Sequence, residues 1–144
     1  MIRKMHSTFL SADGKTKLHL VTYLPNPKHC LFPEGMEETD GVPRAILQIA
    51  HGMTEHIERY DAFAKYMANR GILVVGHDML GHGMSVEDPA NPDLYGYFAE
   101  KDPNRVLLED IYQLMQDMKK RYPDVHFDFH AHNDYDLAVS NSLA

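Results

Sequence analysis

The sequence has one cysteine, no long hydrophobic run and few basic residues, and each shortage excludes a class of protein. Cys30 is alone among 144 residues, so no disulfide can form within the chain and a reducing compartment fits. No apolar run approaches the roughly 18 residues that a membrane helix needs. The basic start, residues 1–6, is not followed by the apolar stretch of a secretory signal. We therefore expect a cytoplasmic protein with no membrane span and no secretion signal.

Lysine and arginine are outnumbered by acidic residues, 14 against 21, which gives a net charge of -7 with histidine neutral. Nucleic-acid binding needs a basic face, so this balance argues against a nucleic-acid partner. With 44% hydrophobic and 24% charged residues, the composition is that of an ordinary globular protein and excludes wholesale disorder. Charge is also uneven, because residues 122–144 contain four acids but no lysine or arginine. This shift predicts a boundary near residue 122.

Hydrophobic periodicity predicts alternating strands and helices along the chain. Two strands flank the turn sequence at 12–15 and form a β-hairpin, and two short apolar runs farther on are buried strands. Apolar spacings of three and four residues indicate helices, the first ending at Gly71 and the second before Pro123. The predicted strands are 7–11, 16–23, 45–50 and 72–75, and the predicted helices contain 60–68 and 107–118. This order implies an α/β fold, a mainly parallel sheet covered by helices, with an amino-terminal β-hairpin.

Both middle strands end in histidine and glycine, at the edge of an open α/β sheet where functional residues collect. His51 and Gly52 allow a sharp turn after the first of these strands, which lets the backbone N–H of Met53 point into the crevice. A free N–H there is what an oxyanion hole needs, although a mere tight turn explains the same pair. After the second strand, in the sequence HDMLGHGMS at 77–85, Asp78 is placed to accept backbone N–H bonds from neighbouring loops.

Taken together, residues 51–85 resemble the amino-terminal half of the α/β-hydrolase fold, and within it the monoacylglycerol lipase and lysophospholipase group of serine hydrolases. The resemblance covers about residues 7–125. It implies that Met53 supplies one oxyanion N–H, with the preceding His-Gly pair shaping the loop. It also implies supporting roles for the residues that match the family's Glu-His and Gly-His-Gly-x-Ser loops, which are Glu55, His56, Gly81, His82, Gly83 and Ser85.

The family carries its nucleophile in a Gly-x-Ser-x-Gly turn between a strand and a helix, because only small neighbours fit that strained elbow. Ten residues after Pro123, where this serine is expected, the sequence has Asn133, followed by Tyr135 in place of glycine. Asparagine is no nucleophile, and the groups of a triad act as a unit. The family's acid, its base histidine and its substrate-selecting lid are expected beyond Ala144. We therefore expect no activity on a lipid-like ester unless further sequence completes the site.

Residues 124–134 alternate strictly between polar and apolar side chains, which predicts a strand with one polar face. His130 and His132 share that face, roughly 6.5–7 Å apart, and either a divalent metal bridges them or solvent covers the face. The segment DFHAHNDYDLAVSNSLA also resembles the His-x-His-Asn-Asp signature of the isopropylmalate, homocitrate and citramalate synthase family. That resemblance implies a metal at the same two histidines. It divides the chain into 1–125, hydrolase-like, and 126–144, of different origin.

Three functions are compatible with these residues. The chain is a hydrolase-derived domain of the carboxylic-ester class, a metal-binding module that uses His130 and His132, or a fold fragment without enzymatic activity. No cofactor is expected in the first or third case. A sheet that stops at the expected nucleophile strand has an unpaired edge, so we expect self-association through that edge. A natural fusion, a designed chimera and an error of sequence assembly each account for the two resemblances.

Overall fold

The computed structural model describes residues 2–31, 42–52, 56–85 and 103–131, which form an α/β fold on one five-stranded sheet. The strands are β1 (Arg3–Leu10), β2 (Lys17–Leu24), β3 (Ala45–Ala50), β4 (Ile72–His77) and β5 (Phe127–Ala131). The α-helices are α1 (Asp61–Ala68) and α2 (Pro103–Arg121), and the 3-10 helices are η1 (Pro27–His29), η3 (Ile57–Tyr60) and η4 (Gly83–Ser85). None of the helices in these ranges combines the length and the apolar character that crossing a membrane requires.

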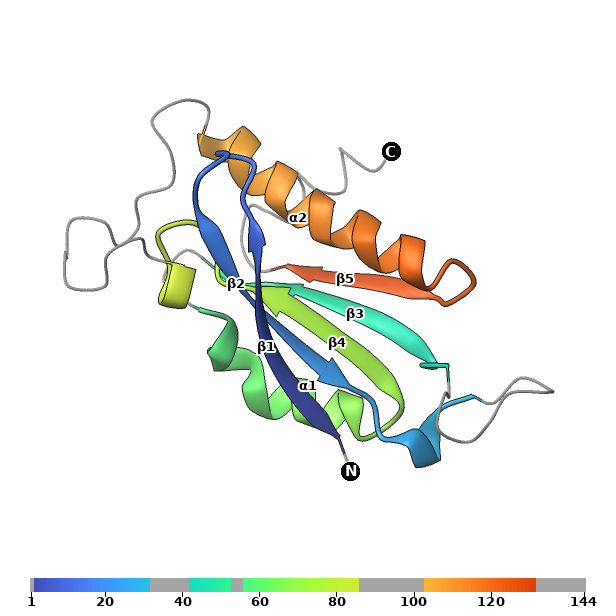
Figure 1. Cartoon of the computed structure of the whole chain (residues 1–144). Coiled ribbons are helices and arrows are strands. Elements are labelled where there is room, and N and C mark those ends of the chain that lie inside the picture. Colours follow the sequence, from blue (N-terminus) through green and yellow to red (C-terminus); the bar gives the residue numbers. More distant parts are fainter. Residues whose placement is uncertain (1, 32–41, 53–55, 86–102, 132–144) are drawn as a thin grey trace.

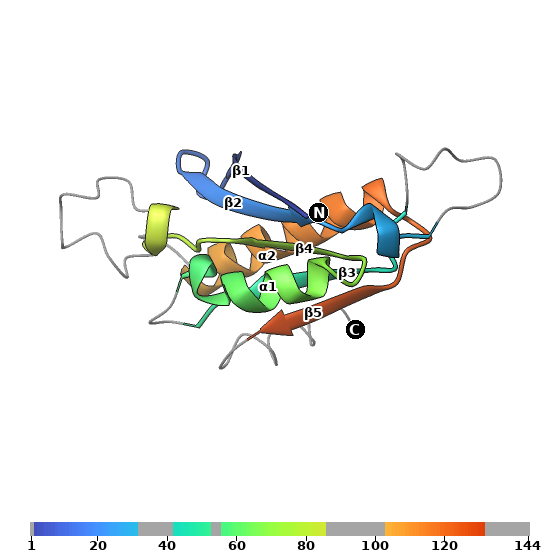
Figure 2. The same ribbon diagram turned by 90° about the horizontal axis from the view of Figure 1, so that it is seen from below.

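The sheet has the strand order β1-β2-β4-β3-β5 (Figure 1). β1 and β2 form the predicted antiparallel hairpin, and β2 pairs with β4 in antiparallel orientation. β3 then pairs in parallel with β4 on one side and with β5 on the other. Figure 2 shows β1 and β5 at the two opposite edges. The predicted α/β fold is confirmed, with three parallel strands extended by the antiparallel hairpin.

The turn between β1 and β2 is held by the side chain of Asp13. Its Oδ1 accepts the backbone N–H groups of Lys15, at 2.9 Å, and Thr16, at 2.8 Å. Gly14, between Asp13 and Lys15, has a φ of 80°, a left-handed conformation that glycine adopts without a steric penalty. The predicted turn at 12–15 therefore has a specific chemical basis in the sequence Asp-Gly.

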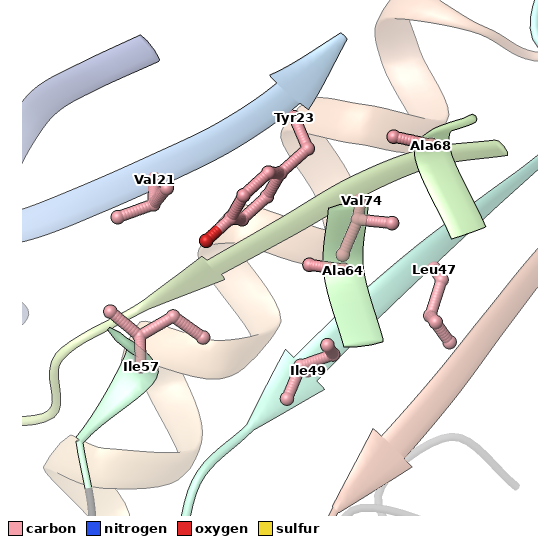
Figure 3. Close-up of a cluster of buried hydrophobic side chains, with 8 residues drawn as sticks. All are labelled: Val21, Tyr23, Leu47, Ile49, Ile57, Ala64, Ala68 and Val74. Atoms are coloured by element: carbon pink, nitrogen blue, oxygen red, sulfur yellow. The ribbon is translucent and has the colours of Figure 1, made fainter. Parts of the chain in front are cut away.

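One face of the sheet packs against α1 and η3. Side chains that alternate along β2, β3 and β4 meet the two small residues that α1 turns inward, which allows a close approach of helix to sheet. The members of this cluster are Val21, Tyr23, Leu47, Ile49, Ile57, Ala64, Ala68 and Val74 (Figure 3). Tyr23 is buried there, and its hydroxyl donates to Asp61 Oδ1 at 2.7 Å, so the polar end of the ring is satisfied.

The opposite face packs against α2. The apolar stripe predicted for this helix is fully buried: Leu107, Ile111, Leu114, Met115 and Met118. It covers the other set of alternating strand side chains, including Leu18, Ile46 and Val75. The basic residues of the last turn, 119–121, lie at the carboxyl end of the helix, where they complement its dipole.

β5 belongs to the same sheet as β1, β2, β3 and β4. Phe127 and Phe129 face the α2 side and pack against its core, whereas Asp128 and His130 are exposed on the other side. The predicted alternation is therefore confirmed over 127–131. Residues 132–144 lie outside the described residues. The separate origin proposed for 126–144 stays a prediction, but β5 itself is an integral strand of the hydrolase-like sheet.

Candidate functional site

The carboxyl ends of β3, β4 and β5 lie at one edge of the sheet because these three strands are parallel. From β3 the chain moves to β4 on one side and later to β5 on the other. In open α/β sheets such a reversal leaves a crevice beyond the strand ends, where ligands bind. His51 directly follows β3, and Asp78 directly follows β4, so both predicted loops lie at this end of the parallel strands.

His51 joins the two loops. Its ring is fully buried, and its Nε2 accepts the backbone N–H of Met79 at 2.9 Å. Because Nε2 is the acceptor, the neutral ring carries its proton on Nδ1, which donates to the carbonyl of Gly52 at 2.8 Å. This clasp fixes the direction of the chain as it leaves Gly52. Met53 and Glu55, the next predicted site residues, lie outside the described residues.

Asp78 is the centre of the second loop. Its Oδ1 accepts the N–H of Ile57 at 2.8 Å, and its Oδ2 accepts the N–H of Met84 at 3.0 Å. The same Oδ2 lies 2.7 Å from Nδ1 of His19, on the neighbouring strand β2. Burial opposes ionisation of this carboxyl group, but these hydrogen bonds outweigh burial and hold its pKa below the usual value. Asp78 therefore ties β2, η3 and η4 together as a carboxylate.

Gly83 is required by the close approach of this carboxylate. A Cβ atom on residue 83 would lie 2.5 Å from the Asp78 carboxyl carbon, and its φ is 49°. Gly81, with a φ of 74°, provides the other left-handed residue of the loop. Ser85 closes the loop: its Oγ accepts the N–H of His19 at 2.8 Å and donates to the carbonyl of Asp78 at 2.5 Å. Ser85 is buried and held on both sides, which is a structural role.

Three further histidines lie near this edge. The ring of His82 is 5.1 Å from the ring of His51, and its Nδ1 lies 2.9 Å from the carbonyl of Leu80. His77, at the end of β4, is buried, and its ring nitrogens have no hydrogen-bond partner among the described residues. Burial lowers its pKa to about 3, so this ring is neutral. His56 is exposed and precedes η3.

His130, one of the two predicted metal ligands, is exposed near the end of β5, with its ring 6.4 Å from the ring of Tyr60. His132 lies outside the described residues. The metal site at these two histidines therefore stays a prediction.

The sequence patterns do not single out His19, although it is buried and contacts Asp78 directly. A signal exists in retrospect. His19 shares a face of β2 with the buried Val21 and Tyr23, and a polar group on an apolar face needs a partner. What the sequence does not provide is the identity of that partner, 59 positions away.

The mixed sheet, the helices on both of its faces and the loops at the ends of β3 and β4 define the α/β-hydrolase class of fold. A carboxyl esterase from Bacillus coagulans superimposes with a TM-score of 0.68 at 25% identity, over 88% of this chain and 35% of the esterase. The sequence matches the family described as serine aminopeptidase, S33, over residues 41–132. That match covers more than half of the chain, which belongs to this family.

Two relatives carry a more specific name. The monoglyceride lipase homolog of Monkeypox virus is 35% identical over 83 residues, which are 58% of this chain and 27% of the relative. The monoglyceride lipase of Mus musculus is 33% identical over 85 residues, which are 59% of this chain and 25% of the relative. The chain thus spans about a quarter of the length of these curated relatives.

The second resemblance is also found among known proteins. The homocitrate synthase of Sulfolobus acidocaldarius is 53% identical over 32 residues, which are 22% of this chain and 7% of the synthase. The identity is high, but the matched segment is short. It supports a local likeness and carries no argument about the fold of the whole chain.

Proposed function

We propose that this chain supplies the amino-terminal framework of a serine hydrolase for carboxylic esters, with monoacylglycerols and lysophospholipids as the substrate class. The observation that carries the proposal is the clasp of His51, which joins the loop after β3 to the loop after β4. The lipase relatives support the ester class. A cytoplasmic location is part of the proposal and rests on the single cysteine.

The contribution of the framework to catalysis is one hydrogen-bond donor. In acyl transfer, the attacked carbonyl oxygen becomes an oxyanion, and preorganised N–H groups stabilise that charge. In α/β-hydrolases one of these N–H groups comes from the loop that follows the third strand. Met53 is the residue after the clasped Gly52, so its backbone N–H takes this role.

The framework does not provide a nucleophile. The sequence around the expected elbow is AHNDY at 131–135, with Asn133 in place of the serine. Ser85, the serine nearest to the candidate site among the described residues, has its hydroxyl engaged by His19 and Asp78. We therefore expect no ester hydrolysis from the 144 residues by themselves.

A fusion tests the framework directly. Residues 1–130 are joined to the part of mouse monoglyceride lipase that begins at its nucleophile elbow, and hydrolysis of p-nitrophenyl butyrate is measured. We expect the fusion to be active. We also expect Met53→Pro, which lacks the N–H, to lower kcat by about 100-fold or more, as loss of one oxyanion donor does.

Met53→Ala is the matched control, because it removes the side chain but retains the N–H. It should keep the activity of the fusion within about threefold. Circular dichroism and thermal unfolding establish that each protein is folded. A folded fusion without activity would contradict the proposed framework, and equal activity of folded Met53→Pro and Met53→Ala would contradict the assigned donor.

A further inference from the structure

A second cluster of polar side chains lies outside the loops described above. It consists of His6 on β1, His19 on β2 and Glu58 in η3. His6 pairs with Val21 and His19 with Thr8, so the two histidines are diagonal neighbours on one face of the hairpin. Their facing nitrogens, Nδ1 of His6 and Nε2 of His19, are 2.8 Å apart. One ligand atom from each of the two histidines and a carboxylate oxygen of Glu58 all lie within 4.8 Å of one another.

The tautomer of His19 places the lone pair of its Nε2 atom in this cluster. The carboxylate of Asp78 can only accept, so the proton of neutral His19 is on Nδ1, which donates to Asp78 at 2.7 Å. Nε2 of His19 is then the unprotonated nitrogen, and it accepts from Nδ1 of His6. A carboxylate behind the distal nitrogen is the arrangement that orients histidine ligands in metal sites. Asp78 thus holds His19 in the tautomer that a metal requires.

The surrounding charge also suits a cation. Among the described residues, the carboxylates linked to this cluster by hydrogen bonds or ion pairs are those of Glu58, Asp61 and Asp78. Lys4 contacts the first two, at 2.6 and 2.7 Å, and Lys65 contacts Asp61 at 2.8 Å. Within this set of described groups, three carboxylates against two ammonium groups leave one negative charge in excess when the histidines are neutral. Lys4 keeps Asp61 as a partner if Glu58 turns toward a bound ion.

We propose that His6, His19 and Glu58 are the ligands of a divalent metal site that binds Zn²⁺. Two imidazole nitrogens and one carboxylate oxygen suit Zn²⁺, whereas Mg²⁺ and Ca²⁺ prefer oxygen ligands alone. Zn–N bonds of about 2.0–2.1 Å in a tetrahedron separate two nitrogen ligands by about 3.3 Å. The observed 2.8 Å therefore has to widen slightly, and His6, exposed on the edge strand, is the side chain that can move.

Zn²⁺ would replace the proton that the two rings share. The displaced proton of His6 moves through solvent from Nδ1 to Nε2, so both imidazoles stay neutral and no proton is released overall. The ion would connect the edge strand β1 to β2 and η3, and through His19 to the loops that Asp78 supports. The proposal of this site does not rest on the proposed hydrolase function.

The test is calorimetric titration of Zn²⁺ into the chelator-treated chain. It starts from the background variant His130→Ala/His132→Ala, because those two histidines are the competing predicted site. We expect one Zn²⁺ per chain in this background and no heat from Mg²⁺. Adding His6→Ala, or separately Glu58→Gln, should weaken Zn²⁺ binding by at least about tenfold, the loss seen even for partners of metal ligands.

The matched control is His29→Ala, which removes another exposed histidine and should leave the affinity within about twofold. Zn²⁺ should also raise the Tm of the background variant but not that of its His6→Ala derivative. The proposal is overturned if His6→Ala binds Zn²⁺ as tightly as its parent. It is equally overturned if removal of His130 and His132 abolishes binding, which would place the ion in the tail.

Discussion

Asp110 is a buried carboxyl group whose replacement by asparagine should stabilise the protein at neutral pH. It lies on α2 and fastens the hairpin: Oδ2 accepts the hydroxyl of Ser11 at 2.8 Å, and Oδ1 accepts the N–H of Ala12 at 2.6 Å. Burial is the dominant influence and raises the pKa of Asp110 from 3.8 to about 6, against the lowering effect of these hydrogen bonds. Between pH 3.8 and about 6, the folded state therefore retains a proton that the unfolded chain has lost, and at pH 7 the folded state has to give that proton up.

The size of the effect follows from this difference in pKa. A group with a raised folded pKa stabilises the protein fully below its unfolded pKa, and this stability is lost as pH rises through the folded pKa. From 3.8 to about 6, at about 1.4 kcal/mol per pKa unit, the loss is roughly 3 kcal/mol. Asparagine avoids this loss and still accepts from Ala12. It leaves the hydroxyl of Ser11 without its acceptor, at a cost of about 1 kcal/mol.

The net expectation for Asp110→Asn is a gain of about 2 kcal/mol at pH 7 and a small loss at pH 4, with a crossing between them. Urea unfolding of both proteins at several pH values between 4 and 7 measures the difference. Only the difference is interpreted, because other groups titrate equally in the two proteins. A difference that does not change with pH, or an asparagine variant that is less stable at pH 7, would refute the reasoning.

Three further predictions concern the framework. Gly83→Ala should destabilise the protein by about 2–3 kcal/mol in thermal unfolding, because the added Cβ would meet the Asp78 carboxylate. The control Gly14→Ala places its Cβ in open space and should cost about 1 kcal/mol. Equal effects of the two substitutions would contradict the close approach of Gly83 to Asp78. Ile111→Ala should lower the free energy of unfolding by about 3 kcal/mol in urea, because its side chain is fully buried. Tyr112→Ala, at an exposed position of the same helix, should lower it by less than about 1 kcal/mol. A small effect at Ile111 would count against the packing of α2 on the core. Self-association through β5 should appear as a sedimentation coefficient that rises with concentration; one constant value would argue against it.

Much of the fold follows from local pattern. The apolar run 45–50 and the stripe that includes Ile111 match the observed β3 and α2, because burial on one or both sides dictates which residues such segments contain. The start of the first helix was harder to predict. Tyr60 fits the helical spacing but ends η3, since a 3-10 turn also brings residues three apart onto one side.

The polar network was less predictable than the core. The position of Asp78 after a strand predicts that it accepts backbone N–H groups, but its contact with His19 depends on β2 lying beside β4, which is a property of the whole sheet. The same holds for Asp110 and Ser11, which are far apart in the sequence and adjacent in the fold. Local periodicity contains no information about such pairs, whereas the requirement that a buried polar group be satisfied shows that a partner exists.

The central claim is that these residues form a hydrolase framework without a nucleophile. A fluorophosphonate probe, which reacts covalently with activated serines, tests it most directly on the 144-residue chain. Intact mass spectrometry after incubation should show the unmodified protein alone, while the active fusion of residues 1–130 with the lipase elbow is labelled in the same experiment. A stoichiometric adduct on any serine of the 144-residue chain would contradict the account.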